Sequence, residues 1–235
     1  MNRIALPLAA IAAAAAATPA MAEVTVAAQG PVIELSVTET VKGEPDQAEI
    51  GAGVTTEAAT AVEAMRLNAE QMTRVVARIR ALGIPANDVQ TTGINLNAAY
   101  DYETGRPVFR GYQASNRVSV LLRKVDQTGP VLDALVAAGA TDLSGPSFSM
   151  ADDTAAKAQA RKAAVAKAAK MAQDYAEWNG YTGVRVLKIS EGVSGGMPMP
   201  MMRTVAMEAA APATPVQPGL VGTSVTVSIT YEMTR

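Results

Sequence analysis

The chain has 235 residues and a formal net charge of −2, and it contains neither histidine nor cysteine. These absences exclude the usual neutral-pH general base, the thiolate nucleophile, disulfides and zinc sites built from these residues. The net charge also shows no excess of basic residues of the kind that favours nucleic-acid binding. What remains must act by binding, by shape, by assembly, or through carboxylates and thioethers. We expect a protein that is not an enzyme and that holds no cofactor.

The first 22 residues have the pattern of a cleaved export signal. Arg3 supplies a positive start, residues 4–17 form an apolar stretch, and Ala20 and Ala22 form the small-x-small pattern that signal peptidase accepts. The apolar stretch is too short to span a bilayer comfortably. We expect cleavage after Ala22, a periplasmic mature chain, and no membrane-spanning segment within it.

The first elements of the mature chain are predicted from alternation and capping. Apolar and polar residues alternate at residues 33–38 and again at 48–54, which predicts two strands joined as a hairpin. A helix is predicted over residues 61–82, because apolar residues recur there at helical spacing and form a stripe of Ala61, Met65, Ala69, Met72, Val76, Ile79 and Leu82. Thr60 and Glu63 form a possible capping box at its start.

The rest of the chain mixes strands and helices. Residues 160, 164, 168, 171 and 175 form a narrow apolar stripe on a long alanine-rich helix, which permits close packing on a sheet. No strict βαβ repeat is present, so the prediction is an α+β fold with a largely antiparallel sheet, long hairpins, two long helices and one short helix. The strands are expected at residues 88–102, 108–124, 143–150, from 184 onward and at 225–233, and the helices at 126–138 and from Asp152 or Asp153 to 179.

Residues 194–219 form a segment rich in methionine, proline and glycine within the single domain predicted for residues 23–235. A segment this long without regular structure is typical of a functional or flexible loop. Thioether sulfurs are soft ligands for Cu(I), and exposed methionines also serve as reversible oxidant sinks. A tolerant loop without either role is the third interpretation. The candidate soft-metal ligands are Met197, Met199, Met201 and Met202.

Four aromatic residues gather where two predicted strands meet their turn. They are Tyr100, Tyr102, Phe109 and Tyr112, in a chain with few other aromatics. Such a cluster can anchor a partner or a neighbouring subunit. It can equally fix the register of the two strands by cross-strand packing. Both interpretations stay open at this point.

Two further patterns have plainer explanations than a ligand site. Gly51 and Gly53 suggest a dinucleotide-binding turn, but Thr56 occupies the third glycine position of that motif. Asp152 and Asp153 could bind a hard cation, yet adjacent acids before a helix are typical of a helix cap. A calcium loop would need further oxygen ligands at alternating spacing. Serine or aspartate nucleophiles have no identifiable partner base.

Two short motifs resemble those of a known family. Pro45-Asp46-Gln47-Ala48 is similar to its PD-x-A signature, and residues 111–118, GYQASNRV, are similar to its GY-x-A-S-N-x-V strand. The alanine-rich helix and the closing 225–227 strand follow in the expected order. The chain thus resembles the SIMPL-domain (DUF541) family of the bacterial periplasmic immunogenic-protein type. The family-motif residues are Pro45, Asp46, Gly111, Tyr112, Ser115 and Asn116.

This resemblance implies an exported α+β protein without established catalytic residues. It also implies a link to oxidative-stress tolerance and assembly into ring-like or channel-like homo-oligomers, as in some relatives. The predicted long hairpins favour a homo-oligomer independently, since exposed strand edges need cover. Envelope partners other than a second copy stay unidentified at the level of sequence.

Overall fold

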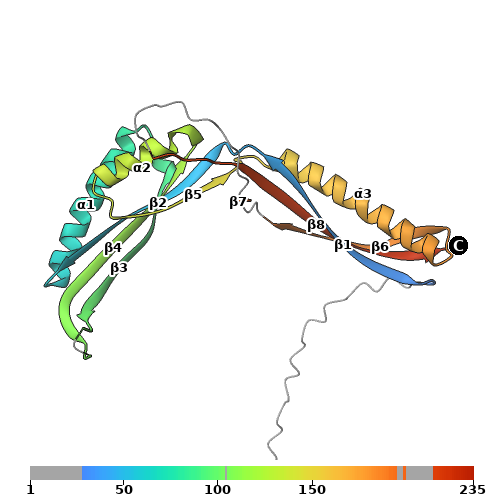
Figure 1. Cartoon of the computed structure of the whole chain (residues 1–235), viewed down its shortest axis with the longest axis horizontal. Coiled ribbons are helices and arrows are strands. Elements are labelled where there is room, and N and C mark those ends of the chain that lie inside the picture. Colours follow the sequence, from blue (N-terminus) through green and yellow to red (C-terminus); the bar gives the residue numbers. More distant parts are fainter. Residues whose placement is uncertain (1–27, 104, 195–197, 200–213) are drawn as a thin grey trace, which may run out of the picture.

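Two antiparallel sheets make up the computed structural model of the chain, one covered on one face by two helices and the other by a single long helix (Figure 1). The structure describes residues 28–103, 105–194, 198–199 and 214–235. Every strand pairing in this part of the chain is antiparallel, which confirms the predicted α+β class. The helices are α1 (Ala61–Ala81), α2 (Thr128–Ala137) and α3 (Thr154–Trp178).

The strands divide into two groups rather than one continuous sheet. The first sheet has the order β3-β4-β2-β5, and the second has the order β1-β8-β6 with β7 paired to β8. The strand bounds are β1 Val32–Gly43, β2 Gln47–Ala58, β3 Val89–Asp101, β4 Val108–Leu122, β5 Asp142–Ser149, β6 Gly183–Ser194, β7 Pro198–Met199 and β8 Leu220–Thr234. Most of these bounds lie within a few residues of the predicted ones.

The predicted hairpin between the first two strands is wrong. β1 pairs along its whole length with β8, from Val32 opposite Glu232 to Gly43 opposite Val221. β2 lies in the other sheet, between β4 and β5. The alternation of apolar residues correctly identified both strands, but it carries no information about which strand is the partner.

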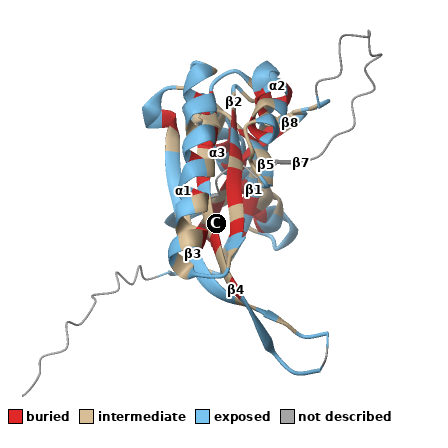
Figure 2. Cartoon of the chain, turned by 90° about the vertical axis from the view of Figure 1, so that its left-hand side faces the viewer, coloured by how far each residue is buried: buried red, intermediate tan, exposed pale blue. Residues whose placement is uncertain are grey.

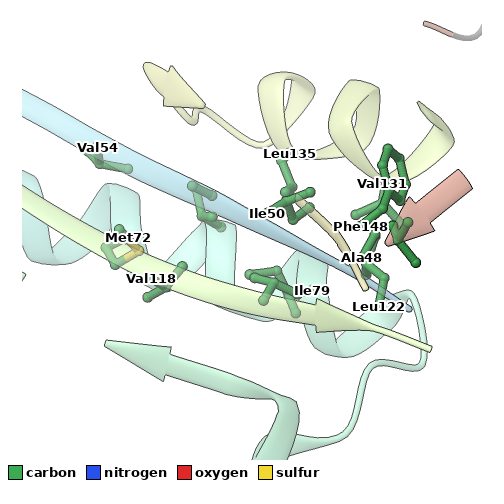
Figure 3. Packing of buried hydrophobic residues seen from close by; sticks show 14 residues of the cluster. Ala48, Ile50, Val54, Met72, Ile79, Val118, Leu122, Val131, Leu135 and Phe148 are labelled. Atoms are coloured by element: carbon green, nitrogen blue, oxygen red, sulfur yellow. The ribbon is translucent and has the colours of Figure 1, made fainter. Parts of the chain in front are cut away.

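The first sheet packs against α1 and α2 around a core of aliphatic side chains (Figure 3). Ile50 and Val54 of β2 and Val118 of β4 face Ile79 of α1 and Leu135 of α2 across this core. The α1 helix begins at Thr60, whose side-chain oxygen accepts the Glu63 N–H as the predicted cap requires. The Glu63 carboxylate binds Arg66 instead of closing the capping box.

The buried face of α1 differs from the predicted stripe at its first turns. Ala64 and Asn68 are buried, in place of the predicted Ala61 and Ala69. The Asn68 side chain donates hydrogen bonds to the carbonyl oxygens of Val54 and Ala114, at 2.8 and 3.0 Å. These bonds offset the cost of burying an amide, so a polar residue can lie on the buried face of the helix.

The second sheet packs against α3 through small side chains. The buried positions of α3 repeat every four residues from Ala160 to Ala176, and all of them are alanine. They confirm the first three residues of the predicted stripe, whereas the predicted Met171 is only partly buried and Tyr175 is 38% exposed. Alanine allows the helix backbone to approach the sheet closely, and Val225, Val227 and Ile229 of β8 fill the layer between them.

β8 connects the two cores. Val221 at its start belongs to the first core, and Val225 onward belongs to the second. The segment before β8 is held on α2, because Thr214 donates from its N–H and Oγ1 to the Asp133 carboxylate, at 3.0 and 2.6 Å. The two helical layers lie on the same side of the molecule, and none of the described helices lies on the opposite sheet faces (Figure 1).

Candidate interaction surface

The predicted aromatic cluster lies at the free end of the β3–β4 hairpin. This hairpin projects beyond α1 (Figure 1), and most of the described residues at its end are coloured as exposed in Figure 2. Among the strands that the structure describes, β3 is the outer one of its sheet and pairs with β4 alone. The register shifts between Ala99 and Tyr100, so Arg110 of β4 is an extra residue opposite this step. Such a bulge turns neighbouring side chains toward a common face.

Three of the four predicted aromatic residues are brought together. The rings of Tyr100 and Phe109 meet edge to face with centroids 5.8 Å apart, and Phe109 meets Tyr112 in the same way at 5.4 Å. Tyr100 and Phe109 are still 47% and 50% exposed, and Tyr102, in the turn, is 68% exposed. Tyr100 and Phe109 therefore pack across the two strands, whereas Phe109 and Tyr112 meet within β4, and much of the surface of Tyr100 and Phe109 stays open to a partner.

The sequence interpretation missed three aliphatic residues of the same hairpin. Ile94, Leu96 and Val108 are 56%, 41% and 51% exposed. Leu96 lies opposite Ala114, a buried residue beside α1, so Ile94 and Leu96 face the helical side of the sheet at a place that α1 does not cover. The alternation of Ile94, Leu96, Ala98 and Tyr100 was a usable signal for this one-sided apolar row.

The GYQASN motif of β4 positions the sheet under α1. Gly111 has a φ of +147°, and a Cβ atom there would lie 2.5 Å from the Ala58 carbonyl oxygen. Only glycine tolerates both conditions. Ser115 lies opposite Asn95 and Thr55 in the pairing with β3 and β2. Asn116 has a buried Oδ1 that accepts no hydrogen bond from the described residues.

The Pro45-Asp46 motif lies where the chain passes from one sheet to the other. The Asp46 carboxylate accepts the Ala151 N–H at 2.7 Å, and the Asp46 N–H donates to the Ser149 carbonyl oxygen at 3.2 Å. The neighbouring Gln47 side chain donates to the Ser149 hydroxyl at 2.9 Å. Asp46 therefore ties the β1–β2 connection to the segment that leads from β5 into α3, and its role is to hold the two sheets together.

The open face of the first sheet contains a shallow, polar hollow of about 450 Å³. Thr55, Asn95 and Ser115 line it, and an ion pair joins Arg117 to Asp142 at its edge. The two charges of that pair neutralise each other. The hollow is therefore polar, and its two charged lining residues balance each other.

The strongly paired carboxylates of the chain serve structural contacts. The Arg123 guanidinium donates two hydrogen bonds to the buried Asp88 carboxylate, at 2.7 and 2.6 Å, and lowers the pKa of Asp88. The side chain of Glu232 is 4% exposed. Hydrogen bonds from Arg185 and from the Gln29 and Gly30 N–H groups lower the pKa of Glu232. A lowered pKa makes a carboxylate a weaker base near neutral pH.

The Asp152-Asp153 and Gly51-Gly53 patterns both make contacts within the fold. Asp153 occupies the cap position of α3, but it is the Asp152 carboxylate that accepts the Thr154 N–H, at 2.9 Å. Gly51 of β2 lies against the Ser144 side chain of β5, and a Cβ atom at Gly51 would overlap it. Across the described ranges, no three histidine, cysteine, aspartate or glutamate side chains are grouped so that they could hold a metal ion.

Two predictions fall outside the described residues. The export signal of residues 1–22 does so entirely, and the candidate ligands Met197, Met201 and Met202 do so as well. The side chain of Met199 is not described either. Among the helices that the structure describes, none is long and apolar enough to cross a membrane.

Comparisons with known proteins agree with the motifs. The family model named SIMPL, described as a protein of unknown function (DUF541), matches residues 33–231. The 26 kDa periplasmic immunogenic protein of Brucella melitensis biotype 1 is 34% identical over 200 residues, which cover 80% of this chain and 79% of that protein. The uncharacterized protein YggE of Escherichia coli K12 is 31% identical over 183 residues, covering 77% and 74% of the two chains. None of these names is that of an enzyme. The chain belongs to the SIMPL family.

Proposed function

We propose that the chain is an exported, non-enzymatic envelope protein that works by assembling with copies of itself. The observation that carries this proposal is the exposed apolar end of the β3–β4 hairpin. Tyr100 and Phe109 are about half exposed although they already contact each other. Exposed aromatic residues that remain in contact are typical anchors of protein interfaces.

The chemistry of the described residues supports a binding role over a catalytic one. The carboxylates with lowered pKa, such as Asp88 and Glu232, are engaged by arginine side chains. The polar hollow on the first sheet holds a self-paired Arg117 and Asp142. A general base or an activated nucleophile would need a partner that shifts its reactivity toward neutral pH. A partner that binds the hairpin end removes apolar surface from water, which favours binding there over binding at the polar hollow.

The test is the mass of the mature chain, residues 23–235, measured by light scattering after size exclusion at micromolar concentrations. We expect an oligomer that dissociates in a Tyr100→Ser, Phe109→Ser double variant. Trp178→Ser is the matched control, since Trp178 is 75% exposed and contacts Tyr175 edge to face on the distant α3 helix. If the wild-type chain is monomeric at every concentration, the proposal is wrong. If the control variant dissociates to the same extent, the hairpin is not the interface.

The periplasmic location and the contribution to oxidative-stress tolerance belong to the same proposal. The location is supported by the pattern of the first 22 residues and by the printed name of the Brucella relative. Fractionation of cells that express the full chain should place a product beginning at Glu23 in the periplasm. A deletion strain should lose viability in peroxide and recover with the wild-type gene. Recovery with the Tyr100→Ser, Phe109→Ser variant would separate the stress role from assembly.

A further inference from the structure

β3 is an edge strand without the usual protection against pairing. Edge strands of natural proteins commonly carry charges, proline or a covering segment. β6 carries Arg185, Lys188 and Glu191, and β1 carries charged residues as well. The outer strand β5 contains Pro146. By contrast, β3 has no charged residue and no proline from Val89 to Tyr100.

The part of β3 that could pair is long and regular. Its pairing with β4 has a bulge at Thr92, and the next register shift adds a residue to β4 instead. β3 is therefore regular from Gly93 to Asp101, and Asn97 lies at the centre of this stretch. A regular, uncharged edge of this length is a template for another strand, because no strand of the described residues pairs with its outward N–H and C=O groups.

The side chains of this stretch are complementary to the same stretch of a second copy. Ile94, Leu96, Ala98 and Tyr100 alternate with polar or small residues, so they share the helical face of the sheet. A two-fold antiparallel arrangement about Asn97 places Leu96 opposite Ala98 of a second copy. It also places Ile94 opposite the second copy's Tyr100. Aliphatic–aromatic pairs of this kind each contribute about 0.2–1 kcal/mol.

The charges of the strand favour the same arrangement. Asp101 is the charged residue of β3, and pairing about Asn97 places it opposite Gly93 of the second copy. Gly93 brings no side chain to this position, and a Cβ atom there would meet only the amide of Asn95, at 3.8 Å. A pairing centred nearer to Asp101 would bring the two aspartates together, and like charges directly opposite each other are destabilising.

We propose that β3 pairs antiparallel with β3 of a second copy about Asn97, which joins two four-stranded sheets into one continuous sheet. This inference rests on the proposed self-assembly and names its interface. α1 of both copies then lies on the same face of the joined sheet, because the two-fold axis is perpendicular to the sheet. The apolar rows of the two hairpins meet between these helices.

The absence of cysteine from the whole chain makes a sharp test possible. Opposed residues of an antiparallel pair have Cα atoms about 4.5–5.5 Å apart, within the range that a disulfide requires. The assembled Asn97→Cys chain should therefore shift mostly to a disulfide-linked dimer on mild oxidation. Asn95→Cys is the matched control, because its equivalent in the second copy would be four residues away, about 13 Å along the strand.

A double variant, Asn95→Cys with Ala99→Cys, should restore the linked dimer, since residues 95 and 99 of the two copies oppose each other in this register. Circular dichroism and thermal unfolding of each reduced variant establish that it folds. If Asn97→Cys stays unlinked while the wild-type chain is oligomeric, or if Asn95→Cys links equally well, the β3 pairing is wrong and self-assembly stands. If the wild-type chain is monomeric, both proposals fall.

Discussion

Gly111 shows how a single residue decides the close packing of a strand. Its φ is +147°, and the Ala58 carbonyl oxygen occupies the place where a side chain would begin. The hydrogen atom of glycine lets β4 approach the end of β2 while the neighbouring Tyr112 turns toward the aromatic cluster. The motif GYQASN therefore combines a packing requirement with one residue of the aromatic cluster.

The substitution Gly111→Ala should lower the free energy of unfolding by about 2 kcal/mol or more, since it adds a steric overlap to an unfavourable backbone conformation. Urea unfolding at pH 7 measures this change. Gly192→Ala is the control, because a Cβ atom at Gly192 of β6 meets nothing within 4 Å. Equal stability of the two variants would contradict the packing role of Gly111.

Glu232 makes stability depend on pH in a defined direction. Its pKa is lowered in the folded chain, first by Arg185 and then by the Gln29 and Gly30 N–H groups. A carboxylate with a lowered folded pKa stabilises the fold above its unfolded pKa of about 4.3, and this stabilisation disappears as the pH falls through the folded value. The buried ionised group therefore favours the folded chain at neutral pH.

We expect Glu232→Gln to be less stable than the wild-type chain at pH 7, with a difference that shrinks as the pH falls below about 4.3. Urea unfolding of both chains between pH 7 and pH 3 measures it. Glu34→Gln, at an exposed position of β1 in the same sheet, should show no such trend. A difference that is constant over the whole range would mean that Glu232 acts through its shape and not its charge.

At the scale of the element, α3 shows how small side chains set a helix close to a sheet. Ala164 and Ala168 are fully buried between α3 and the strands β1 and β8. The spacing of four residues was readable in the sequence, and the first half of the stripe was predicted correctly. The second half of the predicted stripe, Met171 and Tyr175, was wrong, because the buried positions there are Ala172 and Ala176. Side-chain size alone does not reveal which residues of a turn face the sheet.

Ala168→Leu should cost about 1–3 kcal/mol of stability, because a larger side chain in a filled layer forces the helix and sheet apart. Ala166→Leu lies on the exposed side of the same helix and should change stability by less than about 0.5 kcal/mol. Thermal or urea unfolding compares the two. A similar cost for both substitutions would contradict the close packing of α3.

Local patterns predicted the elements better than their pairing. Alternation identified β1, β2 and β8, and Thr60 identified the start of α1. The partner of β1 is β8, at the opposite end of the chain, and no local signal specifies a pairing over such a separation. The aromatic cluster was predictable for the same local reason. The alternation at Ile94 and Leu96 could have indicated an apolar row, but not that α1 leaves this row uncovered.

At the scale of the whole molecule, two cores share one chain and hold each other in place. β8 contributes to both cores, and Asp46 bonds the two connections that pass between the sheets. The aromatic end of the β3–β4 hairpin lies far from this junction (Figure 1). The residues that hold the fold are therefore separate from the surface that we assign to assembly. For this reason the Tyr100→Ser, Phe109→Ser variant should fold normally.

The most direct test of self-assembly is photo-crosslinking in intact cells. A photoreactive amino acid replaces Tyr102, which is 68% exposed at the hairpin turn, and the same replacement at Lys170, on the exposed side of α3, is the control. After irradiation, mass spectrometry identifies what is attached. The account predicts that Tyr102 gives an adduct of two copies of this chain and that Lys170 does not. Adducts of Tyr102 with other proteins alone, or with none, would contradict it.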